Sequence, residues 1–278
     1  LIDVLLDCVW TEFARRHGQV PGARLCVLGM GRLGSRELTA GSDLDLVLLY
    51  HHDPEAEYSD GDKPLAASQY FIRLTQRMIA AMSAPTSQGV IYELDFRLRP
   101  SGNAGPLATH LDSFVKYQRE EAWTWERQAL TRARALAGDV AMMAQAEDTI
   151  ADLLREPVQD KPLAKEIREM RALIEKEKGS ANPFDVKAVA GGLTDIEFIA
   201  QWGVISHGLS HDTRHETSVP AILKACDQQA VPISAREDLL AAWELYNTVL
   251  QVLRLCIDEQ FEAKTAPPRL AELLAHLT

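Results

Sequence analysis

The sequence predicts an α+β fold, in which a small mixed β-sheet with flanking helices is followed by a domain built as a helical bundle. Two observations lead to this prediction. Three short apolar segments typical of strands occur within the first hundred residues, at 24–29, 43–50 and 89–99. From Asp112 onward the apolar residues follow a helical spacing, and no further clear strand is predicted.

The first half of the chain alternates helices and strands. An amphipathic helix is predicted over residues 1–17, because Leu5, Val9 and Phe13 recur at four-residue spacing. After it we expect, in order, a strand at 24–29, a glycine turn at 29–34, a strand at 43–50, a loop at 51–64, a helix at 66–83, a strand at 89–99 and a loop at 101–105. The strand at 43–50 is almost continuously apolar after its acids, which is typical of a strand buried on both faces.

The second half of the chain is predicted to be helical throughout. The expected helices cover about 111–136, in one or two pieces, then 139–155, 161–178, 194–207, 216–229 and 234–262, with a short one after Pro267 and Pro268. Two of them begin with a capping-box pattern, Thr194 with Glu197 and Ser234 with Glu237.

The domain boundary is expected near two prolines. Pro157 and Pro162 interrupt the helical pattern. We therefore predict a catalytic domain over residues 1–157 and a helical domain over residues 158–278.

Composition excludes several classes of protein. The chain has 278 residues, of which 46% are hydrophobic and 25% charged, and its formal net charge is −11, so no general affinity for nucleic acid or for an anionic membrane is expected. Its four cysteines show no CxxC spacing, which suits a reducing, cytoplasmic location and argues against a disulfide framework or a zinc site. No apolar run is long enough to span a membrane, and no signal peptide is expected from the sequence. Because the chain begins at Leu1 inside a helical pattern, we expect it to be part of a longer protein.

Two aspartates at the start of the second strand are the strongest sign of chemistry. Side chains alternate along a strand, so Asp43 and Asp45 point the same way, with Cα atoms roughly 6–7 Å apart. Carboxylates at this spacing suit Mg²⁺, and two such ions are able to clamp the attacking and leaving oxygens of a phosphoryl displacement. The alternative is an exposed pair of acids that merely opens a strand, although Asp is unfavourable there.

A third acid and two arginines follow on the predicted strand at 89–99. On an adjacent strand, Asp95 would complete a three-carboxylate metal site. Arg97 and Arg99 would bind the phosphates of a nucleotide, because the guanidinium presents a planar fork of donors. The alternative is a strand end at which these arginines only neutralise the acids.

The glycine turn before the acidic strand would hold phosphate groups. Gly31, Gly34 and Ser35 allow backbone N–H groups to approach phosphate oxygens closely. The spacing also matches GxGxxG, but the next strand begins about nine residues after Gly34, which is too soon for the crossover helix of a dinucleotide-binding unit. NAD binding is therefore not expected.

Several other residues have two interpretations. Glu126, beside Trp125, either makes a buried hydrogen bond or orients one of the arginines. Arg132 and Arg134 are either solvated or directed at phosphate. Lys187 precedes a double glycine in a loop that could fold over the nucleotide.

Five segments together resemble a known family; they are 29–38, 42–46, 93–102, 121–130 and 185–199. The acids and the glycine turn resemble the nucleotidyltransferase superfamily of the DNA polymerase β type. The chain as a whole resembles the glutamine synthetase adenylyltransferase/adenylyl-removing enzyme family. It departs from the usual family pattern at Ser35, where a second glycine is common, and in the loop at 188–192.

This resemblance implies a nucleotidyltransferase core that uses two Mg²⁺ ions and ATP. Enzymes of the family contain two related domains: the N-terminal one removes AMP from glutamine synthetase by phosphorolysis, and the C-terminal one attaches AMP to a tyrosine. Segments 99–102, 121–126 and 194–198 are more similar to the C-terminal type. The implied catalytic and metal-binding residues are Asp43, Asp45 and Asp95, and the implied nucleotide-binding residues are Gly31, Gly34, Ser35, Arg97, Arg99 and Lys187.

The implied partners are glutamine synthetase, a PII-type signalling protein and a second nucleotidyltransferase domain in the same long chain. Two alternatives stay open from the sequence. The chain could be the adenylyl-removing domain, which shares the acids, or a regulatory module that binds nucleotide or the signalling protein without catalysis.

Overall fold

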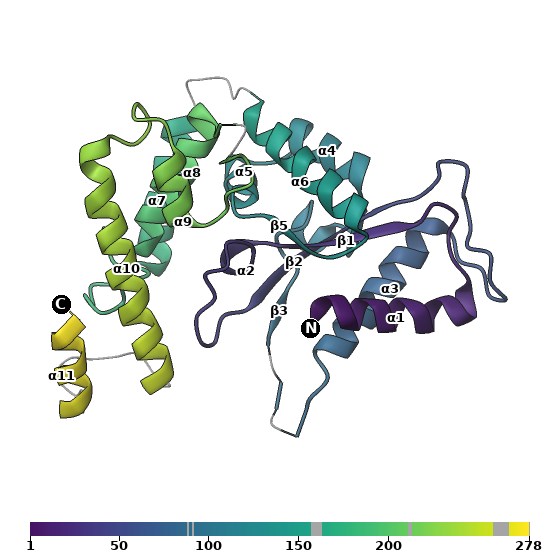
Figure 1. The fold of residues 1–278 in the computed structure, drawn as a ribbon, viewed down its shortest axis with the longest axis horizontal. Helices are drawn as coiled ribbons and strands as arrows, with labels where there is room; N and C mark the ends of the chain where they lie inside the picture. The colour runs from purple at the N-terminus through teal and green to yellow at the C-terminus, as the bar shows by residue number, and fades with distance from the viewer. Residues whose placement is uncertain (88, 91, 157–162, 211–212, 258–266, 278) are drawn as a thin grey trace. The chain divides into compact units, whose positions relative to one another are not determined.

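The computed structural model describes all residues except 88, 91, 157–162, 211–212, 258–266 and 278 (Figure 1). The chain forms two compact units. The first comprises residues 1–37 and 42–153, and the second comprises residues 38–41 and 154–278. The first unit contains a mixed sheet with flanking helices and the second is helical, so the predicted α+β class is confirmed.

The sheet of the first unit has the strand order β3-β2-β1-β5, with β4 also paired to β2. Its strands are β1 (Arg24–Gly29), β2 (Leu44–His51), β3 (Leu94–Asp95), β4 (Ala108–His110) and β5 (Arg134–Gly138). β1 runs antiparallel to β2 and β5, whereas β2 runs parallel to β3 and β4. Parallel and antiparallel pairs therefore meet at β2, the strand that carries Asp45.

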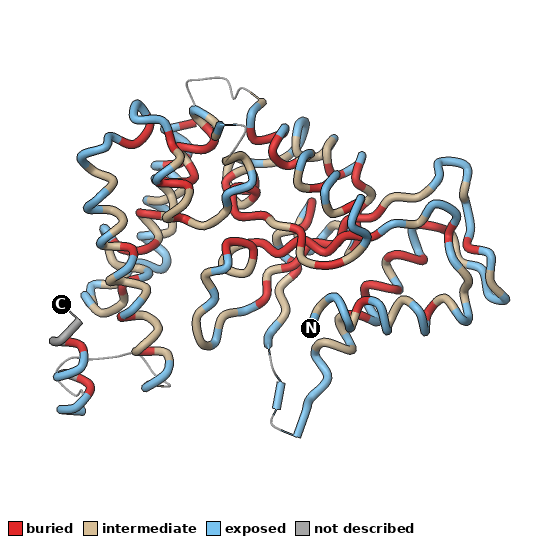
Figure 2. Tube along the Cα trace, viewed as in Figure 1, coloured by how far each residue is buried: buried red, intermediate tan, exposed pale blue. Residues whose placement is uncertain are grey.

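The apolar run of β2 is buried, as its sequence predicts. Leu46, Leu48 and Leu49 have no exposed surface (Figure 2). In Figure 1, α1 (Ile2–His17) and α3 (Ala67–Met82) lie on one side of the sheet, and α4 (Leu111–Glu120) and α6 (Val140–Arg155) lie on the other. Burial on both faces holds the strand in one register, because a slip by one residue would exchange its two faces.

Helices α1 and α3 are joined by a buried tyrosine. The Tyr70 hydroxyl donates to the carbonyl of Gly18 (2.9 Å) and accepts from the indole N–H of Trp10 (3.1 Å). The predicted spacing of α1 is borne out at Phe13, which is buried and packs edge-on against Tyr70. These two helices thus close the apolar core beneath the sheet.

The second unit is built from five helices in the described part of the chain: α7 (Leu163–Lys178), α8 (Leu193–His207), α9 (Val219–Ala225), α10 (Ile233–Cys256) and α11 (Pro268–Leu277). A short segment from early in the chain joins them, since Arg254 of α10 donates to the hydroxyl of Thr39 (2.7 Å). No helix that the structure describes combines the length and the apolar character needed to cross a bilayer.

The prediction of one or two helices over 111–136 is confirmed as far as Leu130, but the expectation that no strand follows is wrong. Helix α4 is followed by α5 (Thr124–Leu130), and the chain then enters strand β5. The alanines of β5 favour a helix when taken alone. Pairing with β1 overrides that preference and buries Ala135 and Ala137 in the sheet. β4, at 108–110, was also not predicted.

The third predicted strand, at 89–99, is far shorter than expected. In the described part of this segment only Leu94 and Asp95 pair with β2, and a turn follows in which Arg99 N–H donates to the carbonyl of Phe96 (3.3 Å). The physical reason lies in Asp95 itself, whose carboxylate accepts the backbone N–H of Arg97 (2.8 Å). Such a local bond competes with strand pairing.

Both predicted capping boxes are wrong. Helix α8 begins at Leu193 with Gly192 as its N-cap, and the Thr194 hydroxyl donates instead to the carbonyl of Lys187 (2.7 Å). Helix α10 begins at Ile233, one residue before the predicted Ser234 cap. A capping-box bond from a backbone N–H to a glutamate occurs instead at the start of α5, where the N–H of Trp123 donates to Glu126.

Three histidines gather where β2 and β4 end. The ring of His110 lies 5.4 Å from the rings of both His51 and His52. Burial is the main cause that lowers the pKa of His110; the neighbouring histidines add to it, and Asp112 opposes it. A histidine with a lowered pKa stabilises the fold above its unfolded pKa, near 6.5, and that contribution is lost as the pH falls toward its folded value.

We therefore expect the free energy of unfolding to fall when the pH is lowered from 7.5 to 5.5. In the H110N variant the same pH change should lower the free energy of unfolding by a smaller amount. Asn is chosen because His110 also caps α4, accepting the backbone N–H of Asp112, and Asn caps helices well. Urea unfolding followed by circular dichroism at both pH values measures the difference. Equal losses in the two proteins would contradict the role assigned to His110.

Candidate active site

The pairing of β2 with β3 brings two of the three predicted acids together. Asp45 and Asp95 are direct partners in the parallel register, so their backbones are about 4.8 Å apart. Asp45 is half-buried, and Asp43, just before β2, is exposed. The acids therefore lie at the end of the sheet where β2 begins.

The glycine turn lies directly against Asp45. It consists of Met30 and α2 (Gly31–Gly34), and the Met30 N–H donates to the carbonyl of Asp45 (2.9 Å). Gly31 has a φ of +51°, and a Cβ there would lie 2.6 Å from a carboxylate oxygen of Asp45. Only glycine allows this backbone to approach the acid so closely.

Ser35 and Gly34 form the buried side of the turn. Ser35 is 1% exposed, and its hydroxyl donates to the Gly31 carbonyl (3.1 Å). A Cβ at Gly34 would lie only 1.9 Å from the carbonyl oxygen of Arg132. The side chain of Ser35 thus belongs to the support of the turn, and any phosphate contact here would be made by backbone N–H groups.

Two arginines hold the turn from the side of β5. The buried guanidinium of Arg132 donates to the Ser35 hydroxyl (2.8 Å) and pairs with Glu37 (2.9 Å). Arg134 donates through Nε to the Gly34 carbonyl (2.9 Å). The sequence left both arginines undecided between solvent and phosphate. The sequence analysis did not predict β5, and it is the pairing of β5 with β1 that places these two arginines beside the turn.

Arg97 reaches back to Asp95. Its Nε donates to the carboxylate (2.7 Å), its Nη2 makes a second bond to the same oxygen, and its backbone N–H binds the other oxygen (2.8 Å). The hydrogen bond from the Arg97 side chain is the first cause that holds the pKa of Asp95 below its usual range. The acid stays ionised, and the arginine neutralises it, as the second of the two sequence interpretations expects.

Arg99 has a different environment from Arg97. It is 8% exposed, and its guanidinium donates to the carbonyls of Phe96 (2.7 Å) and Gly105 (3.2 Å). Burial lowers its pKa. Its visible contacts therefore stabilise the turn after β3, and Arg97 is the more accessible of the two predicted phosphate ligands.

Glu126 makes the buried hydrogen bonds that one interpretation predicted. It is 7% exposed and accepts from the Tyr117 hydroxyl (2.8 Å) and from the backbone N–H of Trp123 (2.9 Å). Both partners lie on the α4–α5 segment. The residue thus fixes the start of α5.

Lys187, the remaining predicted nucleotide ligand, belongs to the second unit. It is exposed in the loop before α8, and its backbone carbonyl accepts from Thr194. Gly191, at the end of this loop, donates its N–H to the carboxylate of Asp195 (2.6 Å). The loop is therefore anchored to α8 at its C-terminal end.

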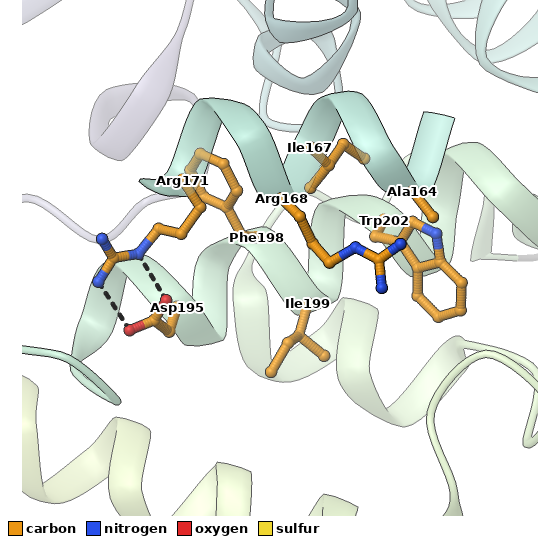
Figure 3. A pocket seen from close by; sticks show the side chains of 8 residues that line it. All are labelled: Ala164, Ile167, Arg168, Arg171, Asp195, Phe198, Ile199 and Trp202. Carbon is orange, nitrogen blue, oxygen red and sulfur yellow. Dashed lines mark hydrogen bonds and ion pairs between the residues drawn. The ribbon is translucent and has the colours of Figure 1, made fainter. Parts of the chain in front are cut away.

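An apolar pocket of about 350 Å³ lies between α7 and α8 of the second unit (Figure 3). It is lined by Ala164, Ile167, Arg168, Arg171, Asp195, Phe198, Ile199 and Trp202. Arg171 closes one end through a two-point ion pair with Asp195 (2.5 and 2.8 Å), and Arg168 extends toward Trp202 at the other (Figure 3). None of the predicted site residues lines this pocket.

The donor set around Asp45 suits a hard cation chemically, although Arg97 is paired with one of its acids in this structure. Three carboxylates, at Asp43, Asp45 and Asp95, are the oxygen donors that Mg²⁺ prefers. Within the described ranges, no three His, Cys, Asp or Glu side chains are grouped as ligands of one ion. The guanidinium of Arg97 supplies the positive charge at Asp95 instead.

Comparisons with known proteins show the family to which the chain belongs. The family model for glutamate-ammonia ligase adenylyltransferase matches residues 1–149. The chain is 51% identical over 277 residues to the bifunctional glutamine synthetase adenylyltransferase/adenylyl-removing enzyme of Mesorhizobium japonicum, and 49% identical over 272 residues to that of Brucella suis. These alignments cover 100% and 98% of the chain but only 28% of either relative. Because the family model covers more than half of the sequence, the chain belongs to the glutamate-ammonia ligase adenylyltransferase family.

Proposed function

We propose that this chain transfers AMP from ATP to a tyrosine of glutamine synthetase, with Mg²⁺ bound by Asp43, Asp45 and Asp95. The observation that carries the proposal is the register of β2 and β3, which sets Asp45 beside Asp95 and against the glycine turn. When bound, the metal would neutralise charge on the phosphate oxygens of ATP and lower the pKa of the attacking phenol.

The protein groups have separate tasks in this reaction. The backbone N–H of Gly31 would contact the outer phosphates and Arg97 would pair with them, whereas Gly34, whose N–H donates to the Met30 carbonyl (2.9 Å), would shape the turn. The tyrosine oxygen forms a bond to the α-phosphorus while the bond to pyrophosphate breaks. A phenol has a pKa near 10, so its proton must leave to a base; we propose Asp95 for this step, or the bound metal, which would lower the pKa of the phenol.

The proposal extends to the longer protein. The relatives named above are bifunctional, and the chain spans 28% of their length. We infer that a second, related catalytic domain exists in the same polypeptide and that a PII-type signalling protein regulates it, both from the resemblance of the sequence. Lys187 also stays a proposed nucleotide ligand, on the resemblance of the sequence alone.

The direction of transfer is tested with the chain, Mg²⁺ and either form of glutamine synthetase. We expect α-labelled ATP to label the unmodified synthetase on tyrosine, with release of pyrophosphate. Label transfer that occurs only from adenylylated synthetase to phosphate, giving ADP, would show the adenylyl-removing activity instead. No transfer in either direction, with nucleotide still bound, would identify a regulatory module.

A further inference from the structure

Asp95, the third carboxylate of the proposed site, is already paired with the guanidinium of Arg97. Arg97 binds Asp95 through its backbone N–H and through two guanidinium nitrogens. The Asp95 side chain is 12% exposed, whereas that of Arg97 is 72% exposed. The acid is thus enclosed, and its partner lies in solvent.

Arg97 is able to leave its partner without disturbing the core. Two other arginines near the site, Arg99 and Arg132, are buried and hold backbone carbonyls or the half-buried carboxylate of Glu37. Moving either of them would leave buried polar groups without hydrogen bonds, which is costly. Among the described residues, the side-chain bonds of Arg97 all go to Asp95, whose carboxylate keeps the backbone N–H of Arg97 (2.8 Å) when the side chain moves.

The other two acids also act on Arg97. The hydrogen bond and charge of Asp95 are the main causes that raise the pKa of Arg97, and the charges of Asp45 and Asp43 add to them. Its guanidinium therefore offsets part of the charge of the acidic group, since one positive charge faces three carboxylates. A divalent cation at the same place would perform the same electrostatic task.

We propose that Arg97 is an exchangeable counter-ion, which holds Asp95 until a nucleotide arrives and then moves to the phosphate groups, so that Asp95 becomes a metal ligand only when the triphosphate is present. This inference rests on the proposed function. A triphosphate offers the guanidinium the same planar, two-point pairing that it makes with a carboxylate. Metal and nucleotide then each raise the affinity for the other by the same factor.

The test measures binding of Mn²⁺, used as the probe for the metal, by the loss of its free electron paramagnetic resonance signal. Titrations are made with and without α,β-methylene ATP, on the unaltered chain, R97Q, R97K and R77Q. We expect R97Q to bind Mn²⁺ alone about two- to fivefold more tightly, a factor typical of one exposed ion pair. The enhancement caused by the nucleotide should shrink in R97Q. R77Q removes an exposed arginine of α3 and should behave like the unaltered chain.

R97K separates exchange from a general charge effect. Lysine keeps the charge but loses the two-point pairing, so Mn²⁺ alone should bind R97K with an affinity between those of R97Q and the unaltered chain. Identical binding of Mn²⁺ alone by R97K and the unaltered chain would show a charge effect only, and would overturn the exchange.

A further variant, D95N, distinguishes failure of this inference from failure of the proposed function. If D95N weakens Mn²⁺ binding in the presence of nucleotide but R97Q leaves binding of Mn²⁺ alone unchanged, the metal site stands and the counter-ion role is wrong. If D95N leaves binding unchanged in the presence of nucleotide, Asp95 is not a ligand and both proposals fall.

Discussion

Asp45→Asn is expected to lower the rate of AMP transfer by about 10²–10³-fold or more. Asp45 is the acid that touches both other parts of the site: it is the register partner of Asp95 and lies against Gly31. Asn keeps the shape of the side chain but removes its charge. Loss of one group that stabilises charge in a transition state commonly costs a factor of this size.

The measurement is single-turnover labelling of glutamine synthetase by α-labelled ATP, with circular dichroism to show that the variant is folded. D7N, which removes an exposed carboxylate from α1, is the matched control and should keep full activity. Chelation of divalent cations should abolish the activity of the unaltered chain, and Mg²⁺ should restore it. Full activity of D45N would place the chemistry outside these acids.

Gly34→Ala is expected to lower the free energy of unfolding more than any other glycine-to-alanine substitution at the site. The new Cβ would lie 1.9 Å from the Arg132 carbonyl and 2.4 Å from that of Gly29. Both neighbours are backbone carbonyls: that of Gly29 ends β1, and that of Arg132 lies two residues before β5. No side-chain rotation therefore relieves the clash. Mutations that force a backbone shift in a packed region fall at the upper end of the usual range, roughly 3–5 kcal/mol.

The comparison variant is Gly41→Ala. Gly41 also has a positive φ of +66°, but a Cβ there meets no atom within 4 Å. Its cost should therefore be the conformational one alone, about 1–2 kcal/mol. Urea unfolding followed by circular dichroism compares the two variants with the unaltered chain. Equal losses would mean that the close packing of Gly34 is relieved by movement of the turn.

The acidic strand was predictable because its signal is local. Its apolar run predicts a buried strand, and the alternation of side chains along a strand directs Asp43 and Asp45 to one face. The approach of Asp95 to Asp45 was an expectation about two strands, and the β2–β3 register agrees with it. The length of β3 was not predictable in the same way, because one bond between Asp95 and the backbone of Arg97 ends the strand.

The support of the glycine turn could not be read from the sequence. Arg132 and Arg134 lie about a hundred positions after the turn that they hold, and the segment between 134 and 138 is rich in alanine, a strong helix former. Nothing local marks these residues as a strand. They form one because β1 offers an unpaired edge, and pairing with it satisfies backbone groups that would otherwise be buried without partners.

The sequence by itself therefore determined the acids, the glycine turn, the fold class and the resemblance to a family, because each depends on residue types at short spacing. Only the tertiary structure decided which arginine meets which acid. Arg99 and Arg132 became buried supports, and Arg97 became the exposed partner of Asp95. These outcomes depend on burial and on contacts between distant segments, which residue spacing along the chain does not encode.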